Sequence, residues 1–226
     1  MRLNLAKVFG IPADKLRVVY MDASGSYGTN GGDDAAADAL LISKTIGKPV
    51  RVQWSREDEH VWDPKGPPQL LAFRAGLDAE GRIHAWETEM WYPKDVPATR
   101  ALLSADAAGL PQEHGQTTLS MTQNTDPPYG VPNVKVTAHW LKETPLRLSN
   151  LRAPGKVGNI FAVESFTDEL AAAAGADAVE FRLRGLKDPR AIAVLQRAAE
   201  MIGWQPRPSP NPNPEPGALR IGRGMA

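Results

Sequence analysis

The sequence predicts an α+β fold in which helices pack on mixed sheets. Three regions carry this prediction: a strand, glycine loop and helix at 16–47, a β-rich region at 48–142 and a helical region at 157–204. Alternating apolar residues predict the strands, and apolar residues at helical spacing predict the helices. The expected architecture is therefore helices and sheets from successive parts of the chain.

Composition excludes several classes of function. The 226 residues include 26 basic and 26 acidic side chains, and the balanced charge gives no general attraction to nucleic acid or to anionic membranes. The absence of cysteine excludes disulfides, thiolate metal sites and iron–sulfur ligation within this chain. No apolar run approaches the roughly 18–20 residues of a membrane span, and the first residues lack a signal-peptide core. A cytoplasmic or periplasmic protein is expected, with the cytoplasm preferred.

The first sixty residues should form two helices and two strands. These are a helix at 2–9, a strand at 16–20, a helix at 35–46 and a short strand at 50–54. Gly10 and Gly47 follow the two helices, as is common at helix ends, and Asp33 and Asp34 open the second one.

The middle of the chain predicts a hairpin. Strands at 70–77 and 82–91 flank the turn sequence Asp78-Ala79-Glu80-Gly81. Residues 93–132 contain no convincing long element, which favours a functional loop or a partner surface. Five tryptophans near the strands favour core or interface positions: Trp54, Trp62, Trp86, Trp91 and Trp140.

The last third turns helical. The expected elements are a strand at 134–141 and helices at 157–174, 178–186 and 190–202. Asp177 caps the second of these helices, and Pro189 occupies the first turn of the third. A Pro-rich linker spans 205–217, and residues 218–226 read as the start of a further strand or domain, so the chain looks unfinished.

The glycine loop between the first strand and the second helix is the feature most open to chemistry. Gly25, Gly28 and Gly31 recur at intervals of three and allow backbone amides to approach a ligand closely. The loop lacks the Gly-Lys-Ser/Thr of a P-loop, and Asp33 and Asp34 would repel a phosphate. Spacing alone favours a tight strand-to-helix turn with an acidic cap over a ligand site.

One cluster could suggest a metal site. Residues 56–60 read Arg-Glu-Asp-Glu-His, but no second histidine or acidic cluster lies nearby in the sequence. A solvated helical turn is the favoured interpretation, and no metal-ligating side chains are predicted.

Five segments in one order resemble a known family. They are the glycine loop with its helix, the stretch Lys48–His60, the run Leu151-Arg152-Ala153-Pro154-Gly155, the stretch Phe161–Ala171 and the stretch Asp177–Arg184. This order resembles the molybdopterin-binding large subunit of the xanthine dehydrogenase/aldehyde oxidase family of molybdenum hydroxylases. The nicotinate- and isoquinoline-dehydrogenase-like bacterial branch is most similar. The match covers almost the whole chain but only a middle portion of such a subunit.

The resemblance implies that residues 1–204 bind a molybdenum–molybdopterin cofactor, in its cytosine dinucleotide form. The glycine loop of the family matches Gly25, Ser26, Tyr27 and Gly28, so the amides of Tyr27 and Gly28 inherit the role of holding the oxygen ligands of molybdenum. Arg152 and Ala153 match the residues that contact the cofactor from the opposite side, with Glu164 twelve positions later, as in the family.

Two positions of the implied substrate pocket depart from the family. Gly31 stands where many members carry a glutamate that positions substrate, and Pro154 replaces an aromatic residue that stacks on it. Both changes argue against a purine-like substrate.

The implied function is part of an oxidoreductase that hydroxylates N-heterocycles or aldehydes. Its expected partners are a 2Fe–2S subunit, the remaining portion of the molybdopterin subunit and the small-molecule substrate. The general-base glutamate of the family lies near the C-terminus of that subunit, and no such segment follows Ala226, so no catalytic residue is expected here. The isolated chain should be inactive. The alternative is a non-catalytic interaction or assembly module that keeps the scaffold.

Overall fold

The chain forms two compact units, each assembled from segments far apart in the sequence. The computed structural model describes residues 1–28, 34–93, 102–112, 121–141, 145–149, 151–211, 217, 219 and 222–226. Unit 1 contains residues 1–68, 92–120 and 140–154, and unit 2 contains residues 69–91, 121–139 and 155–226. Residues 1–204 are thus shared between both units, and the boundaries expected at residues 204 and 217 remain predictions.

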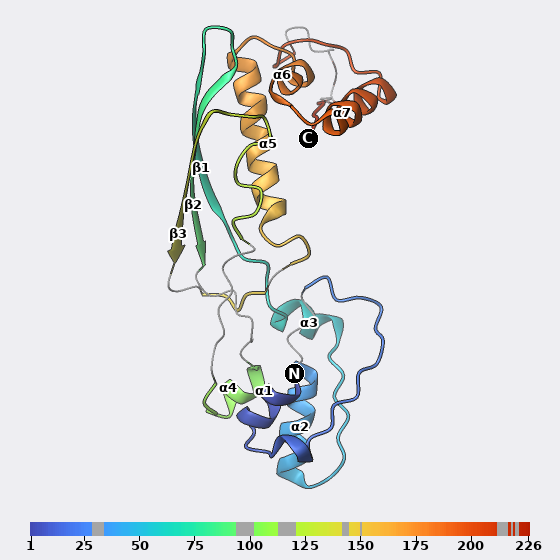
Figure 1. Cartoon of the computed structure of the whole chain (residues 1–226). Coiled ribbons are helices and arrows are strands. Elements are labelled where there is room, and N and C mark those ends of the chain that lie inside the picture. The colour runs from blue at the N-terminus through green and yellow to red at the C-terminus, as the bar shows by residue number, and fades with distance from the viewer. Residues whose placement is uncertain are drawn as a thin grey trace. The chain divides into compact units, whose positions relative to one another are not determined.

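Unit 1 is mainly helical in its described part (Figure 1). Its elements are α1 (Arg2–Val8), the 3₁₀ turn η1 (Ala13–Lys15), α2 (Asp34–Ile46), α3 (Arg56–Trp62) and α4 (Leu103–Ala107). Gly10 and Gly47 both adopt positive φ, at +61° and +67°, directly after the first two predicted helices. The helical turn predicted at 56–60 is confirmed as α3, which begins with a capping box between Ser55 and Asp58.

The core of unit 1 joins the N-terminal helix to α2 and α4. Leu5, Val8 and Phe9 pack with Ala37, and Leu102 and Ala105 complete the cluster. The Nζ of Lys44 donates a hydrogen bond to the carbonyl of Phe9, which fastens the end of α2 to the end of α1. Apolar burial supplies most of this stabilisation, at about 25 cal/mol per Å² of area removed from water.

The strands predicted at 16–20 and 50–54 are wrong. No strand pairing occurs in either stretch of the described chain, although the backbone at Leu16 is extended, with φ −109° and ψ 117°. Val19 and Tyr20 are exposed, so β-forming residues there have no neighbouring strand to pair with. The burial of residues 50–54 does alternate as predicted, which shows that the pattern identified extended backbone without identifying a ladder.

Unit 2 is built on a mixed three-stranded sheet. The strands β1 (Leu70–Leu77), β2 (Ile83–Pro93) and β3 (Asn133–Leu141) lie in the order β1-β2-β3, and the ends of β2 and β3 continue into unit 1. β1 and β2 form the predicted antiparallel hairpin, with Phe73 opposite Thr88. β3 runs alongside β2 in the same direction, as the ion pair of Lys135 with Glu87 and the stacking of His139 on Trp91 indicate (Figure 1).

The long helix α5 (Lys156–Ala173) covers one face of this sheet (Figure 1). Trp86 is only 2% exposed, and its ring packs edge-on against Phe73 and Phe166 at centroid distances of 5.5 and 5.1 Å. Such aromatic pairs add about 0.5–1.5 kcal/mol each beyond their burial. The core position predicted for Trp86 is therefore confirmed.

Two shorter helices complete unit 2, as predicted. α6 (Ala178–Gly185) begins at the N-cap Asp177, and α7 (Pro189–Met201) begins at the N-cap Asp188 with proline in its first turn. Asp177 also accepts hydrogen bonds from the Trp204 indole and the Arg207 backbone, which hold the following segment to α6. Leu219 and residues 222–226, the described part of the stretch expected to begin a further strand or domain, form no strand in this structure, and that expectation stays a prediction.

None of the helices in the described part of the chain combines the length and the apolar character that crossing a bilayer requires.

Candidate functional site: two strained segments joined in unit 1

The glycine loop ends in an unusual backbone conformation. Gly25 and Gly28 have φ of +149° and +93°, and Tyr27 between them has φ of +50°. A Cβ on Gly25 would lie 2.7 Å from Cε2 of the Tyr27 ring, so a larger residue would displace that ring. Tyrosine in the left-handed region is uncommon, because its Cβ crowds the backbone.

The segment predicted to face the glycine loop is strained in the same way. Ala153 has φ of +59°. In the described part of the chain, the non-glycine residues with positive φ are Tyr27, Ala153 and Asn124, and asparagine tolerates this region well. Each such residue costs about 1–3 kcal/mol and persists where surrounding structure holds it, often at functional sites. Two of the three therefore mark the two segments that the sequence predicts to hold a cofactor.

These two segments are joined directly. The N–H of Arg152 donates a hydrogen bond of 2.8 Å to the carbonyl of Tyr27, and the Ser149 hydroxyl donates one to the carbonyl of Gly28. The Arg152 guanidinium carbon also lies 5.9 Å from the centroid of the Tyr27 ring. The fold thus brings Tyr27, Gly28, Arg152 and Ala153 together, as the cofactor assignment requires.

Ser149 is itself held rigidly. It is buried, and its N–H donates to the carbonyl of Lys65, while the N–H of Lys65 donates to the carbonyl of Arg147, both at 2.9 Å. This short bridge between Lys65 and Leu148 is parallel in direction. The Ser149 hydroxyl therefore projects toward the glycine loop from a fixed backbone.

An ion pair anchors the same segment to the start of α2. The guanidinium of Arg147 contacts both carboxylate oxygens of Asp34, at 2.9 and 2.7 Å, and also donates to the carbonyl of Trp62. Asp34 is 4% exposed and further accepts a hydrogen bond from the N–H of Leu103. The expectation that Asp34 repels an anion is wrong, because Arg147 neutralises its charge; Asp33 lies outside the described residues.

The joined segments present groups suited to an oxygen-rich, anionic cofactor. Tyr27 is 61% exposed, and no acceptor for its N–H occurs among the described residues. Arg152 and Ala153 are exposed beside it, and Pro154, predicted to line the substrate pocket, is half-buried next to Ala153. Neutral amides and one guanidinium are donors that match oxo and phosphate oxygens. Gly31, the other predicted pocket residue, lies outside the described residues.

Glu164 is engaged elsewhere. Both of its carboxylate oxygens lie 2.8 Å from the Tyr129 hydroxyl, and one accepts a 2.9 Å hydrogen bond from Nε of the buried Arg182. Burial, and then the hydrogen bond to Glu164, raise the pKa of Tyr129. Arg182 is bound on its other side by Asp168. Glu164 thus serves the packing of unit 2, a role that its spacing from Arg152 does not reveal.

Sequence reasoning missed the residues that position the site. Ser149 and Arg147 belong to no local motif, because their partners are brought in from more than a hundred positions away, and the place of Asp34 at the start of a helix does not reveal its pairing with Arg147. The only available signal is the clustering of polar residues just before the Leu151–Gly155 run.

Comparison with known proteins identifies the family of the chain. Residues 1–186 match the family described as the molybdopterin cofactor-binding domain. The chain is 40% identical over 228 residues to one of the subunits of nicotinate dehydrogenase from Pseudomonas putida, a match that covers 100% of this chain and 19% of that protein. It is 32% identical over 214 residues to the beta subunit of isoquinoline 1-oxidoreductase from Brevundimonas diminuta, covering 89% of this chain and 25% of that protein. The chain therefore spans about a fifth to a quarter of these relatives.

A solved structure shares the fold. The aldehyde oxidoreductase from Desulfovibrio gigas superposes with a TM-score of 0.65 over 88% of this chain and 22% of that one, at 17% sequence identity. The predicted α+β fold of a molybdenum-cofactor-binding domain is confirmed by this likeness. With two strained segments joined as described and with a family match over most of its length, the chain belongs to the molybdopterin cofactor-binding domain family.

Proposed function

We propose that this chain supplies part of the molybdenum–molybdopterin site of an oxidoreductase that hydroxylates N-heterocycles or aldehydes. The observation that carries the proposal is the hydrogen bond between Arg152 and Tyr27, which joins the glycine loop to the second predicted cofactor segment. The family match over residues 1–186 supports the cofactor class. The relatives named for nicotinate and isoquinoline support an N-heterocyclic substrate, and the neighbour named aldehyde oxidoreductase supports the aldehyde option.

The residues proposed to hold the cofactor are Gly25, Ser26, Tyr27, Gly28, Arg152 and Ala153. When bound, the molybdenum centre supplies the two-electron redox chemistry. The amides of Tyr27 and Gly28 orient oxygen ligands without titrating, because a backbone N–H keeps its proton at every relevant pH. The Arg152 guanidinium adds a permanent positive charge for an anionic group. Gly31 and Pro154 are proposed to leave room for substrate.

The finer assignments follow the same proposal. The cofactor is taken to be the cytosine dinucleotide form, with iron–sulfur clusters on a partner 2Fe–2S subunit and the general base on the remaining portion of the molybdopterin subunit. The names of the relatives support a multisubunit assembly, since both are called subunits. A cytoplasmic location is part of the proposal and is tested by fractionation of the source cells.

The direct test is the molybdenum and pterin content of the native complex. We expect near-stoichiometric molybdenum in the complex purified with this chain, and loss of most of it in the Gly28→Val variant, because a branched side chain intrudes into the loop. Gly47→Val is the matched control: Gly47 also has positive φ, in the same unit, and a Cβ there would meet nothing within 4 Å. Molybdenum retained in Gly28→Val, or lost equally in both variants, would contradict the glycine-loop assignment.

A further inference from the structure

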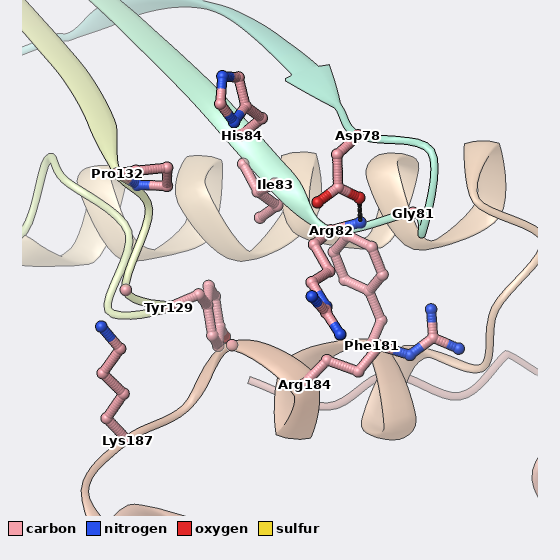
Figure 2. Close-up of a pocket in the computed structure, with 12 residues that line it drawn as sticks. Asp78, Gly81, Arg82, Ile83, His84, Tyr129, Pro132, Phe181, Arg184 and Lys187 are labelled. Atoms are coloured by element: carbon pink, nitrogen blue, oxygen red, sulfur yellow. Dashed lines mark hydrogen bonds between the residues drawn. The ribbon is translucent and has the colours of Figure 1, made fainter.

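Unit 2 contains a cavity lined by charged and apolar residues, none of which belongs to the cofactor segments. Its volume is about 230 Å³, and it lies between the β1–β2 turn, the turn at residues 129–132 and the end of α6 (Figure 2). The lining residues that matter here are Asp78, Arg82, Tyr129, Phe181, Arg184 and Lys187. The cavity is smaller than the roughly 300–1,000 Å³ of pockets for drug-sized ligands, so it suits a small group.

Positive charge dominates this cavity. Three permanent cations line it against one carboxylate, that of Asp78. Asp78 already accepts a hydrogen bond of 2.7 Å from the N–H of Arg82 (Figure 2) and one of 3.0 Å from the N–H of Glu80, which close the hairpin turn. Both bonds are accepted by Oδ1, so the carboxylate keeps its charge, and the lining has three cations against this one anion.

Two of the cations have no anionic partner among the residues that the structure describes. Within the described part of the chain, no carboxylate pairs with the side chain of Arg82 or of Lys187, whereas Arg184 bonds Glu180 at 2.7 Å. A helix C-terminus favours basic residues and accounts for Arg184 on α6. It does not account for Arg82, which is contributed by the hairpin. The hairpin and the segment after α6 thus both place a cation, unpaired among the described residues, in the lining of one cavity.

The cavity walls are rigid. A Cβ on Gly185 would lie 2.7 Å from the carbonyl oxygen of Tyr129, and one on Gly130 would lie 2.9 Å from Cε of Lys187. The end of α6 and the 129–130 turn therefore touch with no space for a side chain. Tyr129 is fixed by its hydrogen bonds to Glu164, and Phe181 is buried. The walls are therefore preformed, whereas the exposed side chains of Arg82 and Lys187 lose rotamer freedom when they hold an anion.

We propose that this cavity binds a phosphate group, either as free inorganic phosphate or as the phosphoryl end of a phosphomonoester. Arg82 and Lys187 supply charge-assisted hydrogen bonds, Arg184 adds a third cation, and His84 lies at the same lining. The inference is independent of the proposed function, because every residue involved belongs to unit 2 and none is assigned to the cofactor.

The test is a titration of the full chain with inorganic phosphate, and separately with phenyl phosphate, followed by NMR or calorimetry at constant ionic strength. Saturable one-site binding is expected, weakened about tenfold or more by Arg82→Gln and by Lys187→Gln, as expected for loss of a charged hydrogen bond. Stronger binding of phosphate indicates the free ion as ligand, and stronger binding of phenyl phosphate indicates a phosphomonoester.

Arg190→Gln is the matched control, because it removes the same charge from unit 2 at a side chain that is 90% exposed. The affinity of Arg190→Gln for phosphate should stay within about twofold of that of the unsubstituted chain, because surface ion pairs contribute little. Phosphate binding that does not saturate, or that is weakened equally by Arg82→Gln and Arg190→Gln, would contradict the proposed phosphate site. Near-UV circular dichroism checks that each variant is folded. If Arg82→Gln does not fold, Lys187→Gln, at an exposed side chain, still tests the proposal. The molybdenum content of the native complex tests the proposed cofactor site separately.

Discussion

The N–H of Arg152 lies within hydrogen-bond distance, 2.8 Å, of the Tyr27 carbonyl, while the Arg152 guanidinium lies beside the Tyr27 ring. The backbone of Arg152 therefore holds the two cofactor segments together, and its side chain remains exposed for a ligand. Substitution of the side chain leaves the backbone hydrogen bond in place. The structural and ligand-binding roles of this residue can thus be separated by mutation.

Arg152→Ala should lower turnover of the purified complex about tenfold or more while leaving the thermal stability of the chain nearly unchanged. Loss of one hydrogen bond to a charged ligand costs about 1.5–3 kcal/mol, and the exposed cation–π contact contributes about 0.5–1 kcal/mol. Steady-state kinetics and a melting curve measure the two effects. Arg56→Ala, at an exposed ion pair with Glu59 in the same unit, is the control. Unchanged turnover in Arg152→Ala would contradict the proposal that Arg152 belongs to the cofactor site.

Ser149→Ala should weaken cofactor retention without unfolding the chain. The Ser149 hydroxyl supports the carbonyl of Gly28, and one such hydrogen bond is worth about 1 kcal/mol. The rate of pterin release from the complex should rise several-fold. Ser43→Ala is matched chemically, because the Ser43 hydroxyl also donates to a backbone carbonyl, that of Lys48, at an exposed place in unit 1. Equal release rates in both variants would show that Ser149 does not position the loop.

Arg147→Met should destabilise unit 1 by about 3–5 kcal/mol, because Asp34 would keep a buried charge with no cation opposite it. Hydrogen exchange of the α2 amides reports this loss locally, which matters because two units need not unfold together. Adding Asp34→Leu to Arg147→Met should recover part of the stability, since the unpaired charge is then removed. If the double variant is less stable than the single one, the carboxylate is held by more than this ion pair.

Unit 2 should lose stability at alkaline pH through Tyr129. Burial and the hydrogen bond to Glu164 raise the pKa of Tyr129 in the folded state above its ordinary value of 10.0. The unfolded chain therefore releases this proton first, so the stabilisation is complete below pH 10 and is lost as pH rises above it. Urea unfolding from pH 8 to 11 measures the effect. Tyr129→Phe should reduce the slope, whereas Tyr20→Phe, at an 82% exposed side chain, should leave it unchanged. Identical slopes in the parent and Tyr129→Phe would contradict the assignment.

Local signals predicted most of the secondary structure. The caps Asp177 and Asp188, the glycines that end α1 and α2, and the Asp78–Gly81 turn all act within a few residues of the chain. Their effect is present in the sequence because the interacting groups are sequence neighbours. The two failed strands, 16–20 and 50–54, show the limit: β propensity indicates extended backbone, but a strand also needs a partner that propensity does not identify.

The order of residues alone was enough to predict most of the helices, the hairpin and the family to which the two cofactor segments belong. How those segments meet emerges only in the folded chain: through Arg152 and Tyr27, through Ser149 and Gly28, and through the Arg147–Asp34 ion pair. The pairing of Glu164 with Arg182, only 18 positions apart, also emerges only there, because it depends on how α5 packs against α6. Separation along the chain explains the difference. Contacts between residues more than a hundred positions apart form only when the folded cores bring those residues together, so no short pattern encodes them.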